Sequence, residues 1–197
     1  MRKLIFASQN EGKVKEVVQI LLELNIEIIS LADLNEHIEI IEDGDSFEAN
    51  AIIKAKQVYN KFKLPTIADD SGLVVEQLNG APGIYSARYA GKDGNDKANN
   101  KKLLTELKSH PEPHIAKFVC AAAYYNGQEL HTEIGEFKGR IIDEEHGSYG
   151  FGYDPLFVPD GYSITSAEMK PALKNSISHR FNAFNKLKKY LINEISN

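Results

Sequence analysis

Short apolar runs separated by polar turns predict the strands of this chain. The first occupies residues 3–7, and the second, with its exit loop, occupies residues 26–34. A third apolar segment lies in residues 38–46 and ends in acidic residues and a glycine. A fourth apolar run leads into Asp69 and Asp70, where we expect two strand-like pieces on either side of an Asp-Ser-Gly stretch. The first half of the chain is therefore expected to supply several strands of one sheet.

Apolar residues that recur every three or four positions predict the helices. Helical spacing begins after Asn10, near Ser46, before Leu103 and near Ser178. Asn10 and Ser178 are suitable N-caps, and Asp45 has the spacing of a capping box with Glu48. The first unit of the chain is thus strand, polar loop and helix.

The second half of the chain carries a hairpin signal. Asn126 and Gly127 stand between two strand-like runs, and an Asn-Gly pair in that position strongly favours a β-hairpin. A hairpin adds antiparallel strands to those of the strand–helix units. The pattern therefore predicts a mixed, twisted β-sheet flanked by helices, of the α/β or α+β class, within one domain of 197 residues.

Composition excludes several classes of protein. The net charge is −5, which disfavours a general nucleic-acid binder, because such proteins are usually basic. No window approaches a membrane span, and the apolar run at the start is too short for a secretion signal. The single cysteine, Cys120, lies in an apolar run and is expected in the core. We expect a cytoplasmic protein that binds neither nucleic acid nor membranes.

The polar stretch Ser8–Lys13 joins the first strand to the first helix. Backbone N–H groups and the helix dipole favour an anion there, and Lys13 is disfavoured in the first turn unless it faces one. A phosphate group is the natural candidate, and a solvated surface lysine is the alternative. The stretch lacks the glycine spacing of a P-loop.

Two acidic clusters follow apolar runs. One contains Glu42 and Asp45, and the other is the Asp69–Asp70 pair. Mg²⁺ prefers one or two carboxylates together with phosphate oxygens, so the clusters can supply a magnesium site if they meet at one sheet edge. Ordinary turn chemistry is the alternative for both. Because neighbouring residues of a strand point to opposite faces, we expect one carboxylate of the pair to face the site and the other to brace a neighbour.

Further polar and aromatic groups complete the candidate set. Asn50 and Lys54 are four positions apart and share one helix face. Phe151 and Tyr153 lie among glycines, where aromatic rings can stack on a planar base. Lys174 and the Ser-His-Arg stretch that follows it place hydrogen-bond donors near a helix start. Each group has an ordinary alternative, a solvated face, core packing or a helix cap, but together they suit a nucleotide with Mg²⁺.

Five blocks of sequence resemble the inosine triphosphate pyrophosphatase family. They are SQNEGKVKEV, EDGDSFEANAIIKA, ADDSGLVVEQLNGAPGIYSARYAG, GFGYDPLF and KNSISHR. The blocks run in family order from Phe6 to Arg180 and cover nearly the whole chain. The resemblance implies a mixed α/β fold, a single elongated domain over residues 1–197 with two lobes around a central active-site cleft, and a homodimer.

The resemblance also implies an activity, the Mg²⁺-dependent hydrolysis of ITP, dITP and XTP to a monophosphate and pyrophosphate, which cleans the nucleotide pool. By matched motifs it assigns the metal to Glu42 and Asp70, with Asp70 also as the catalytic proton acceptor. Lys13 is expected to be catalytic as well, because its ammonium can hold the departing pyrophosphate. Asp69 is then expected to be structural. The substrate-binding set, to which Lys54 is added from its helix face, is Ser8, Gln9, Asn10, Glu11, Gly12, Lys13, Lys54, Ser71, Phe151, Gly152, Tyr153, Asp154, Lys174, His179 and Arg180.

Base selectivity has a simple expected form. Hypoxanthine and xanthine present an acceptor at O6, where adenine presents an amine donor. Donors from His179 and Arg180 would be left unpaired by ATP, which favours ITP and XTP.

Two positions depart from the family pattern. Ala49 stands where the family often has a glutamate, so that role is not carried over, and Glu48 is expected to be a cap residue only. The segment EEHGSYG lacks a proline that often precedes the glycine-rich loop, which leaves the approach of that loop open.

Three other interpretations compete with this one. A Maf-like nucleotide pyrophosphatase would have other base preferences, and a nucleotide sensor would bind without hydrolysing. A structural α/β protein would have neither property. The acidic clusters disfavour the sensor, because a protein that only binds an anion gains little from extra carboxylates.

Overall fold

The computed structural model describes residues 2–34, 38–91 and 94–196. The chain folds into two compact units. The first comprises Met1–Asp70, Cys120–Gly135 and His179–Asn197, and the second comprises Ser71–Val119 and Glu136–Ser178.

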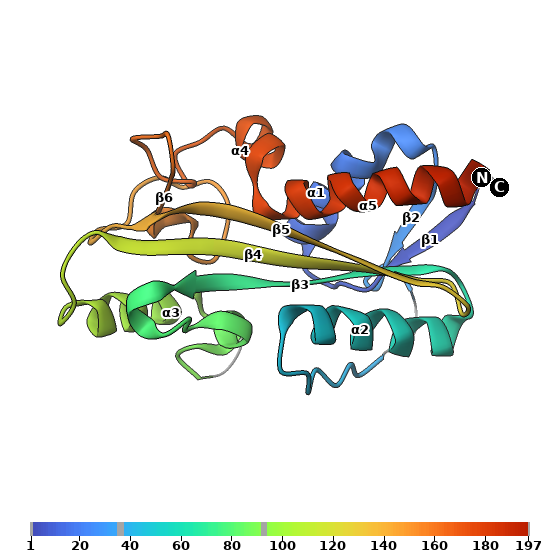
Figure 1. Ribbon diagram of the computed structural model, residues 1–197, viewed down its shortest axis with the longest axis horizontal. Coiled ribbons are helices and arrows are strands. Elements are labelled where there is room, and N and C mark those ends of the chain that lie inside the picture. Colours follow the sequence, from blue (N-terminus) through green and yellow to red (C-terminus); the bar gives the residue numbers. More distant parts are fainter. Residues whose placement is uncertain (1, 35–37, 92–93, 197) are drawn as a thin grey trace. The chain divides into compact units, whose positions relative to one another are not determined.

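Strands and helices alternate along the first half of the chain, and a hairpin follows (Figure 1). The strands are β1 (Lys3–Phe6), β2 (Glu27–Ser30), β3 (Thr66–Val75), β4 (His114–Tyr125), β5 (Leu130–Ile141) and β6 (Phe157–Pro159). The helices are α1 (Glu11–Leu21), α2 (Phe47–Phe62), α3 (Asp96–Leu107), α4 (Pro171–Ile177) and α5 (His179–Ser196). Short 3-10 turns occupy Leu22–Leu24, Glu76–Leu78, Gly83–Arg88 and Asp154–Leu156.

The sheet is mixed. Its strand order is β2-β1-β3-β4-β5-β6, with β1 parallel to both β2 and β3, and β5 antiparallel to β6. β4 and β5 are joined by the four residues 126–129, so the predicted Asn-Gly hairpin is confirmed. The predicted α/β class with a mixed sheet and helices is confirmed as well.

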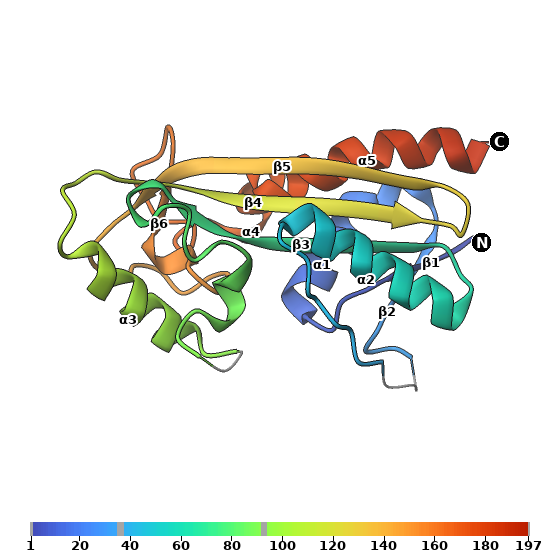
Figure 2. The same ribbon diagram turned by 60° about the horizontal axis from the view of Figure 1, so that its bottom comes forward.

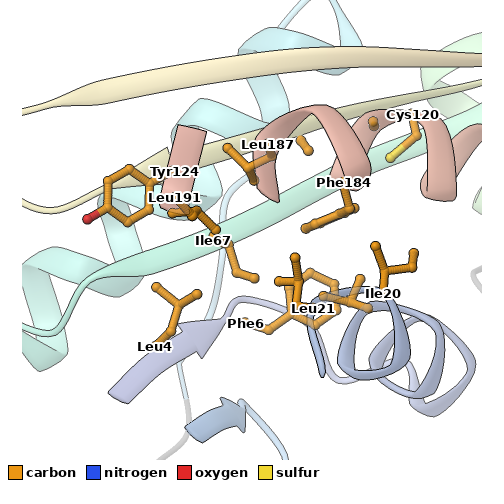
Figure 3. Packing of buried hydrophobic residues seen from close by; sticks show 13 residues of the cluster. Leu4, Phe6, Ile20, Leu21, Ile67, Cys120, Tyr124, Phe184, Leu187 and Leu191 are labelled. Carbon is orange, nitrogen blue, oxygen red and sulfur yellow. The ribbon is translucent and has the colours of Figure 1, made fainter. Parts of the chain in front are cut away.

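In the first unit, helices cover both faces of the strands (Figure 1). Leu4 and Phe6 of β1 pack with α1 and α5, and Figure 3 shows Phe184 and Leu187 of α5 in this cluster. Ile5, between them in the sequence, packs with Ala51, Ala55 and Val58 of α2 on the other face. Cys120 is fully buried in the first cluster, as predicted (Figure 3).

The second unit has a separate core. Leu73 and Val75 of β3 pack with Leu103 and Leu107 of α3, and Phe137 of β5 belongs to the same cluster. Figure 2 shows α3 beside the strands of this unit. No helix within the described ranges is long and apolar enough to cross a membrane.

Two strand predictions were wrong. Residues 38–46 form no strand, because the peptide N–H and C=O of Ile41 hydrogen-bond the side-chain amide of Gln57 at 3.1 and 3.0 Å. The apolar side chains of Ile38 and Ile40 still pack against the α2 core. The two pieces expected around Asp-Ser-Gly are one continuous strand, β3, which carries both aspartates.

One cap prediction was confirmed and one was wrong. Asn10 caps α1, and its side chain accepts from the Lys13 N–H. The cap of α2 is Ser46 rather than Asp45, since the Ser46 hydroxyl accepts from the Ala49 N–H at 3.1 Å. The Glu48 carboxylate accepts a hydrogen bond from the Thr132 hydroxyl.

Candidate functional site

β3 directs its two aspartates to opposite faces of the sheet in the first unit. Ile67 packs with α1 and α5, and Ala68 packs with α2. Because side chains alternate along a strand, Asp69 lies on the same face as Ile67, and Asp70 lies on the same face as Ala68. The hydrogen-bond partners agree, since Asp69 contacts Lys13 of α1 and Asp70 contacts helix α2. The prediction that the pair divides between two faces is confirmed.

Asp69 is a buried carboxylate that is held by two cations. Its side chain is 1% exposed, and it lies 3.1 Å from Lys13 Nζ and 2.9 Å from Arg180 Nη2. Burial alone would raise the pKa of Asp69, but the charges of Lys13 and Arg180 outweigh it and hold the pKa far below its ordinary value. Asp69 is therefore ionised and fully engaged within the protein.

Arg180 is the largest of the fully buried side chains among the described residues, and its charge is compensated on two sides. Nε and Nη2 donate to Asp69, and Nη1 donates to Glu16 Oε2 at 2.6 Å. Burial lowers the pKa of Arg180, but Asp69 and Glu16 outweigh that effect and raise it. Lys13, Arg180, Asp69 and Glu16 thus form a balanced set of two positive and two negative charges. His179, the residue before Arg180, is also buried.

Asp70 faces α2 and stands in a different environment. Its Oδ1 accepts from Lys54 Nζ at 3.2 Å, and its Oδ2 accepts from Asn50 Nδ2 at 3.2 Å. Burial raises the pKa of Asp70, and the nearby Glu42 and Asp69 charges add to this against the opposing charges of Lys54 and Lys13. Asp70 is therefore a buried carboxylate whose proton affinity is increased.

Lys54 joins Asp70 to Glu42. Its ammonium lies 2.9 Å from Glu42 Oε2 and 3.2 Å from Asp70 Oδ1, with only 8% of the side chain exposed. Burial lowers the pKa of Lys54, but the charges of Asp70, Asp69 and Glu42 outweigh it, so the pKa is raised. Asn50 adds order to this group, because its Oδ1 accepts from the Gly44 N–H, close to Glu42 in the chain.

The Glu42–Asp70 pair fits a magnesium ion. The two carboxylates converge on one cation, the Lys54 ammonium, and Mg²⁺ is commonly held by one or two carboxylates. Asp69 does not fit that role, because its oxygens are taken by Lys13 and Arg180.

The loop before α1 is polar and mostly open to solvent. Ser8 Oγ accepts from the Asn10 N–H at 3.2 Å, and Asn10 Oδ1 accepts from the Lys13 N–H at 3.0 Å. Gln9, Asn10 and Glu11 are exposed, whereas Ser8, Gly12 and Lys13 are half-buried. The structure therefore brings Lys13 together with Asp69 rather than leaving it as a free surface lysine.

In the second unit, Asp154 organises the glycine-rich loop. Its Oδ2 accepts from the Phe151 N–H at 2.9 Å and from the Lys174 ammonium. Lys174 Nζ also lies 5.0 Å from the centre of the Phe151 ring, in cation–π contact. Gly152 N–H donates to Asp96 Oδ2 at 2.7 Å. Phe151, Asp154 and Lys174 thus form one connected group.

Tyr153 has a different position from Phe151. Its ring lies in the core of the second unit, and its hydroxyl donates to the Ser86 carbonyl at 2.8 Å. Phe151 is half-buried. Core packing, the ordinary alternative for this loop, therefore applies to Tyr153. Ser71 is half-buried at the start of the second unit, directly after Asp70.

Two polar residues that matter here were not singled out from the sequence. Glu16 binds Arg180, 164 positions away, and no local pattern indicates that pairing. The Ser86 carbonyl accepts a hydrogen bond from the Tyr153 hydroxyl, and the Ser86 hydroxyl accepts one from the Leu73 N–H. Both partners are distant from Ser86 in the sequence. Asn50, which was noted only for its helix face, is a direct partner of Asp70.

Residues 4–190 match the model of the Ham1 family. Proteins named dITP/XTP pyrophosphatase from Oceanobacillus iheyensis and Bacillus subtilis are each 46% identical to this chain, over 97% of it and 98% of the relative. The solved structures of Ham1 proteins from Staphylococcus aureus and Coxiella burnetii each have 38% identity and a TM-score of 0.88, and the match covers 98% of this chain and 100% of the other. The family resemblance inferred from the five sequence blocks is confirmed.

Proposed function

This chain belongs to the Ham1 family, and from that we propose that it hydrolyses dITP and XTP to a monophosphate and pyrophosphate. It is a nucleoside triphosphate pyrophosphatase, a hydrolase of nucleotide metabolism. ITP, which carries the same base as dITP, is included in the proposal. Mg²⁺ dependence, a homodimer and a cytoplasmic location are proposed with it.

The observation that carries the proposal is the pair of carboxylates around Lys54. Asp70 is buried, has a raised pKa and is fixed through both oxygens, by Lys54 and Asn50. A proton acceptor works best when its pKa lies closer to the working pH, so the raised pKa suits Asp70 for accepting a proton from the attacking water. Lys54 and Asn50 are positioning residues, because they hold the carboxylate in one orientation.

Glu42 and Asp70 would hold the magnesium ion. When bound, Mg²⁺ neutralises the negative charge that develops on the phosphate oxygens. Lys54 lies between the same two carboxylates and keeps their repulsion small when no ion is present.

We propose that the loop Ser8–Lys13 binds the triphosphate through its backbone N–H groups and the Lys13 ammonium. The loop precedes the start of α1, where the helix dipole favours an anion. Lys13 keeps 18% of its side chain exposed while it is paired with Asp69. Asp69 therefore acts on the substrate through Lys13, as a positioning residue, and these preplaced donors stabilise the departing pyrophosphate.

The base is proposed to stack on Phe151, with Lys174 beside the ring. Tyr153 and Asp154 support this loop from the core. Gly152 and Ser71 are proposed to contact the nucleotide as well. For Arg180 we propose a structural role, because all three guanidinium nitrogens donate to Asp69 or Glu16. His179 remains the candidate donor to O6 of the base.

Pyrophosphate release from dITP, XTP, ITP, GTP and ATP, with and without Mg²⁺, tests the proposal. We expect Mg²⁺-dependent turnover of the first three, well above GTP and ATP. Equal turnover of all five, or a preference for other bases as in a Maf-like enzyme, would contradict it. Binding of dITP without pyrophosphate release would favour the sensor interpretation, and sedimentation at micromolar concentration tests the homodimer.

A further inference from the structure

Three metal-ligating side chains converge in the second unit, outside the set assigned to the nucleotide. Glu112 and His114 stand on either side of Pro113 at the start of β4, and Asp143 follows the end of β5. Because β4 and β5 form a hairpin, the start of one lies beside the end of the other. One ligand atom from each of the three side chains lies within 4.8 Å of those of the other two.

His114 is the buried member of this cluster. The residue is 4% exposed, and in the described part of the chain its Nδ1 has no hydrogen-bond partner. Its Nε2 lies 4.0 Å from Asp143 Oδ1, which is beyond hydrogen-bond distance. Leaving a buried polar atom without a partner is unfavourable. The buried imidazole thus lies beside the Glu112 and Asp143 carboxylates with Nδ1 unpartnered and Nε2 beyond hydrogen-bond distance of Asp143.

The His131–Glu133 pair of this chain shows the shorter distance of an ordinary histidine–carboxylate hydrogen bond. His131 contacts one carboxylate, that of Glu133, at 3.0 Å. His114 Nε2 and Asp143 Oδ1, 4.0 Å apart, are too far apart for a hydrogen bond but leave room for an ion, since two ligands of a tetrahedral Zn²⁺ lie about 3.4 Å apart at ordinary bond lengths. The Asp143 side chain is 70% exposed and is free to rotate toward such an ion.

We propose that Glu112, His114 and Asp143 bind a divalent transition-metal ion, Zn²⁺ by preference, with water completing the coordination. Imidazole nitrogen and carboxylate oxygen are both ordinary ligands of Zn²⁺ in proteins. Mg²⁺ prefers oxygen ligands alone and keeps several waters, so the imidazole selects against it. This site is thus chemically different from the Glu42–Asp70 pair.

The backbone around the cluster is already held in place. Gln77 Nε2 donates to the carbonyls of Pro111 and Pro113 at 3.3 and 2.7 Å, and the Ile142 N–H donates to the Leu156 carbonyl at 2.9 Å. Little ordering is then needed for an ion to bind. A bound ion joins the segment before β4 to the segment after β5, and it stabilises the folded state because the unfolded chain does not bring these ligands together.

Zinc binding to the intact protein in excess Mg²⁺ tests the proposal, because Mg²⁺ then occupies the Glu42–Asp70 pair. We expect the wild type to bind one Zn²⁺ with micromolar affinity. Asp143→Asn and His114→Gln should each weaken binding by at least about tenfold. His131→Gln, which removes a histidine paired with a carboxylate elsewhere, is the matched control and should bind as the wild type does.

A second readout identifies the ligands. Co²⁺ in place of Zn²⁺ should give visible absorption bands in the wild type that are lost in His114→Gln. Asp143→Asn changes an exposed side chain and should leave far-UV circular dichroism and Mg²⁺-dependent turnover unchanged, so a binding defect in it is not a folding defect. Wild-type Zn²⁺ affinity in both Asp143→Asn and His114→Gln, or a millimolar affinity in the wild type, would overturn the proposal.

Discussion

Asp69 and Asp70 are adjacent in β3 but belong to two different charge groups. Asp69 is bound by Lys13 and Arg180 on the α1–α5 face, and Asp70 is bound by Lys54 and Asn50 on the α2 face. The pKa of Asp69 is lowered and that of Asp70 is raised. The same residue type thus has a structural role at one position and a chemical role at the next.

Matched Asp→Asn substitutions should separate these roles. In Asp70→Asn we expect turnover of dITP to fall by about 10²–10⁴-fold, because the proton acceptor is lost. Its stability should change by less than about 1 kcal/mol, since burying an uncharged amide there relieves a desolvation penalty. Steady-state kinetics and urea unfolding measure the two effects.

Asp69→Asn should lower the stability of the protein, whereas Asp70→Asn should mainly lower its activity. The substitution removes the Asp69 charge from the buried Arg180 guanidinium, which costs about 3–5 kcal/mol of unfolding free energy. Wild-type stability in Asp69→Asn together with wild-type activity in Asp70→Asn would contradict the assignment of the two carboxylates.

Lys54→Met should make stability depend on Mg²⁺. Without the ammonium, Glu42 and Asp70 face each other with no cation between them, and we expect a loss of about 3 kcal/mol in Mg²⁺-free buffer. Added Mg²⁺ should restore more stability to this variant than to the wild type, because it replaces the missing charge. Thermal unfolding with and without Mg²⁺ measures the difference.

The control for that substitution is Lys56→Met, two positions along the same helix. Lys56 is exposed and lies 5.8 Å from the Tyr125 ring centre, with little expected contribution to stability. A Mg²⁺ response of Lys54→Met equal to that of Lys56→Met would show that the two carboxylates do not share a cation position.

Cys120 should be unreactive in the folded protein. Burial raises the pKa of its thiol, and the Asp69 carboxylate, 3.9 Å away, raises it further. Because the thiolate is the reactive form, the thiolate fraction near pH 8 is very small. We expect Ellman's reagent to label Cys120 only at the rate of unfolding. Labelling that rises with pH and is faster than unfolding would contradict this.

Local signals in the sequence predicted local structure. The N-cap at Asn10 was predictable because the N–H that it accepts from, that of Lys13, is only three positions away. The hairpin was predictable because Asn126 and Gly127 favour a tight turn through their own backbone preferences. The strand predicted around Ile41 is absent, and the Ile41 peptide N–H and C=O instead hydrogen-bond the side chain of Gln57, which belongs to the helix that follows. The alternation of side chains along β3 predicted that Asp69 and Asp70 lie on opposite faces, but it could not predict which residues pair with them. Arg180 lies 111 positions from Asp69, and only the folded chain brings the two together.

Gly72→Ala should destabilise the second unit, because this position in β3 has no room for a side chain. An added Cβ would lie 2.3 Å from Ser86 Oγ and 2.5 Å from the Gly83 carbonyl oxygen. Ser86 cannot move freely, since its hydroxyl accepts from the Leu73 N–H and donates to the Gly83 carbonyl. We expect a loss of about 1–3 kcal/mol, measured by urea unfolding.

Ser86→Ala and the double variant locate the cause of that loss. Ser86→Ala alone leaves the buried Leu73 N–H without its acceptor, at a cost of about 1–3 kcal/mol. In the double variant the Ser86 hydroxyl no longer meets the new methyl group, so the combined loss should be smaller than the sum of the two single losses. Strictly additive losses would mean that the Ser86 hydroxyl is not what resists the Gly72 methyl, which then meets the Gly83 carbonyl and the Cβ of residue 86, 2.9 Å away.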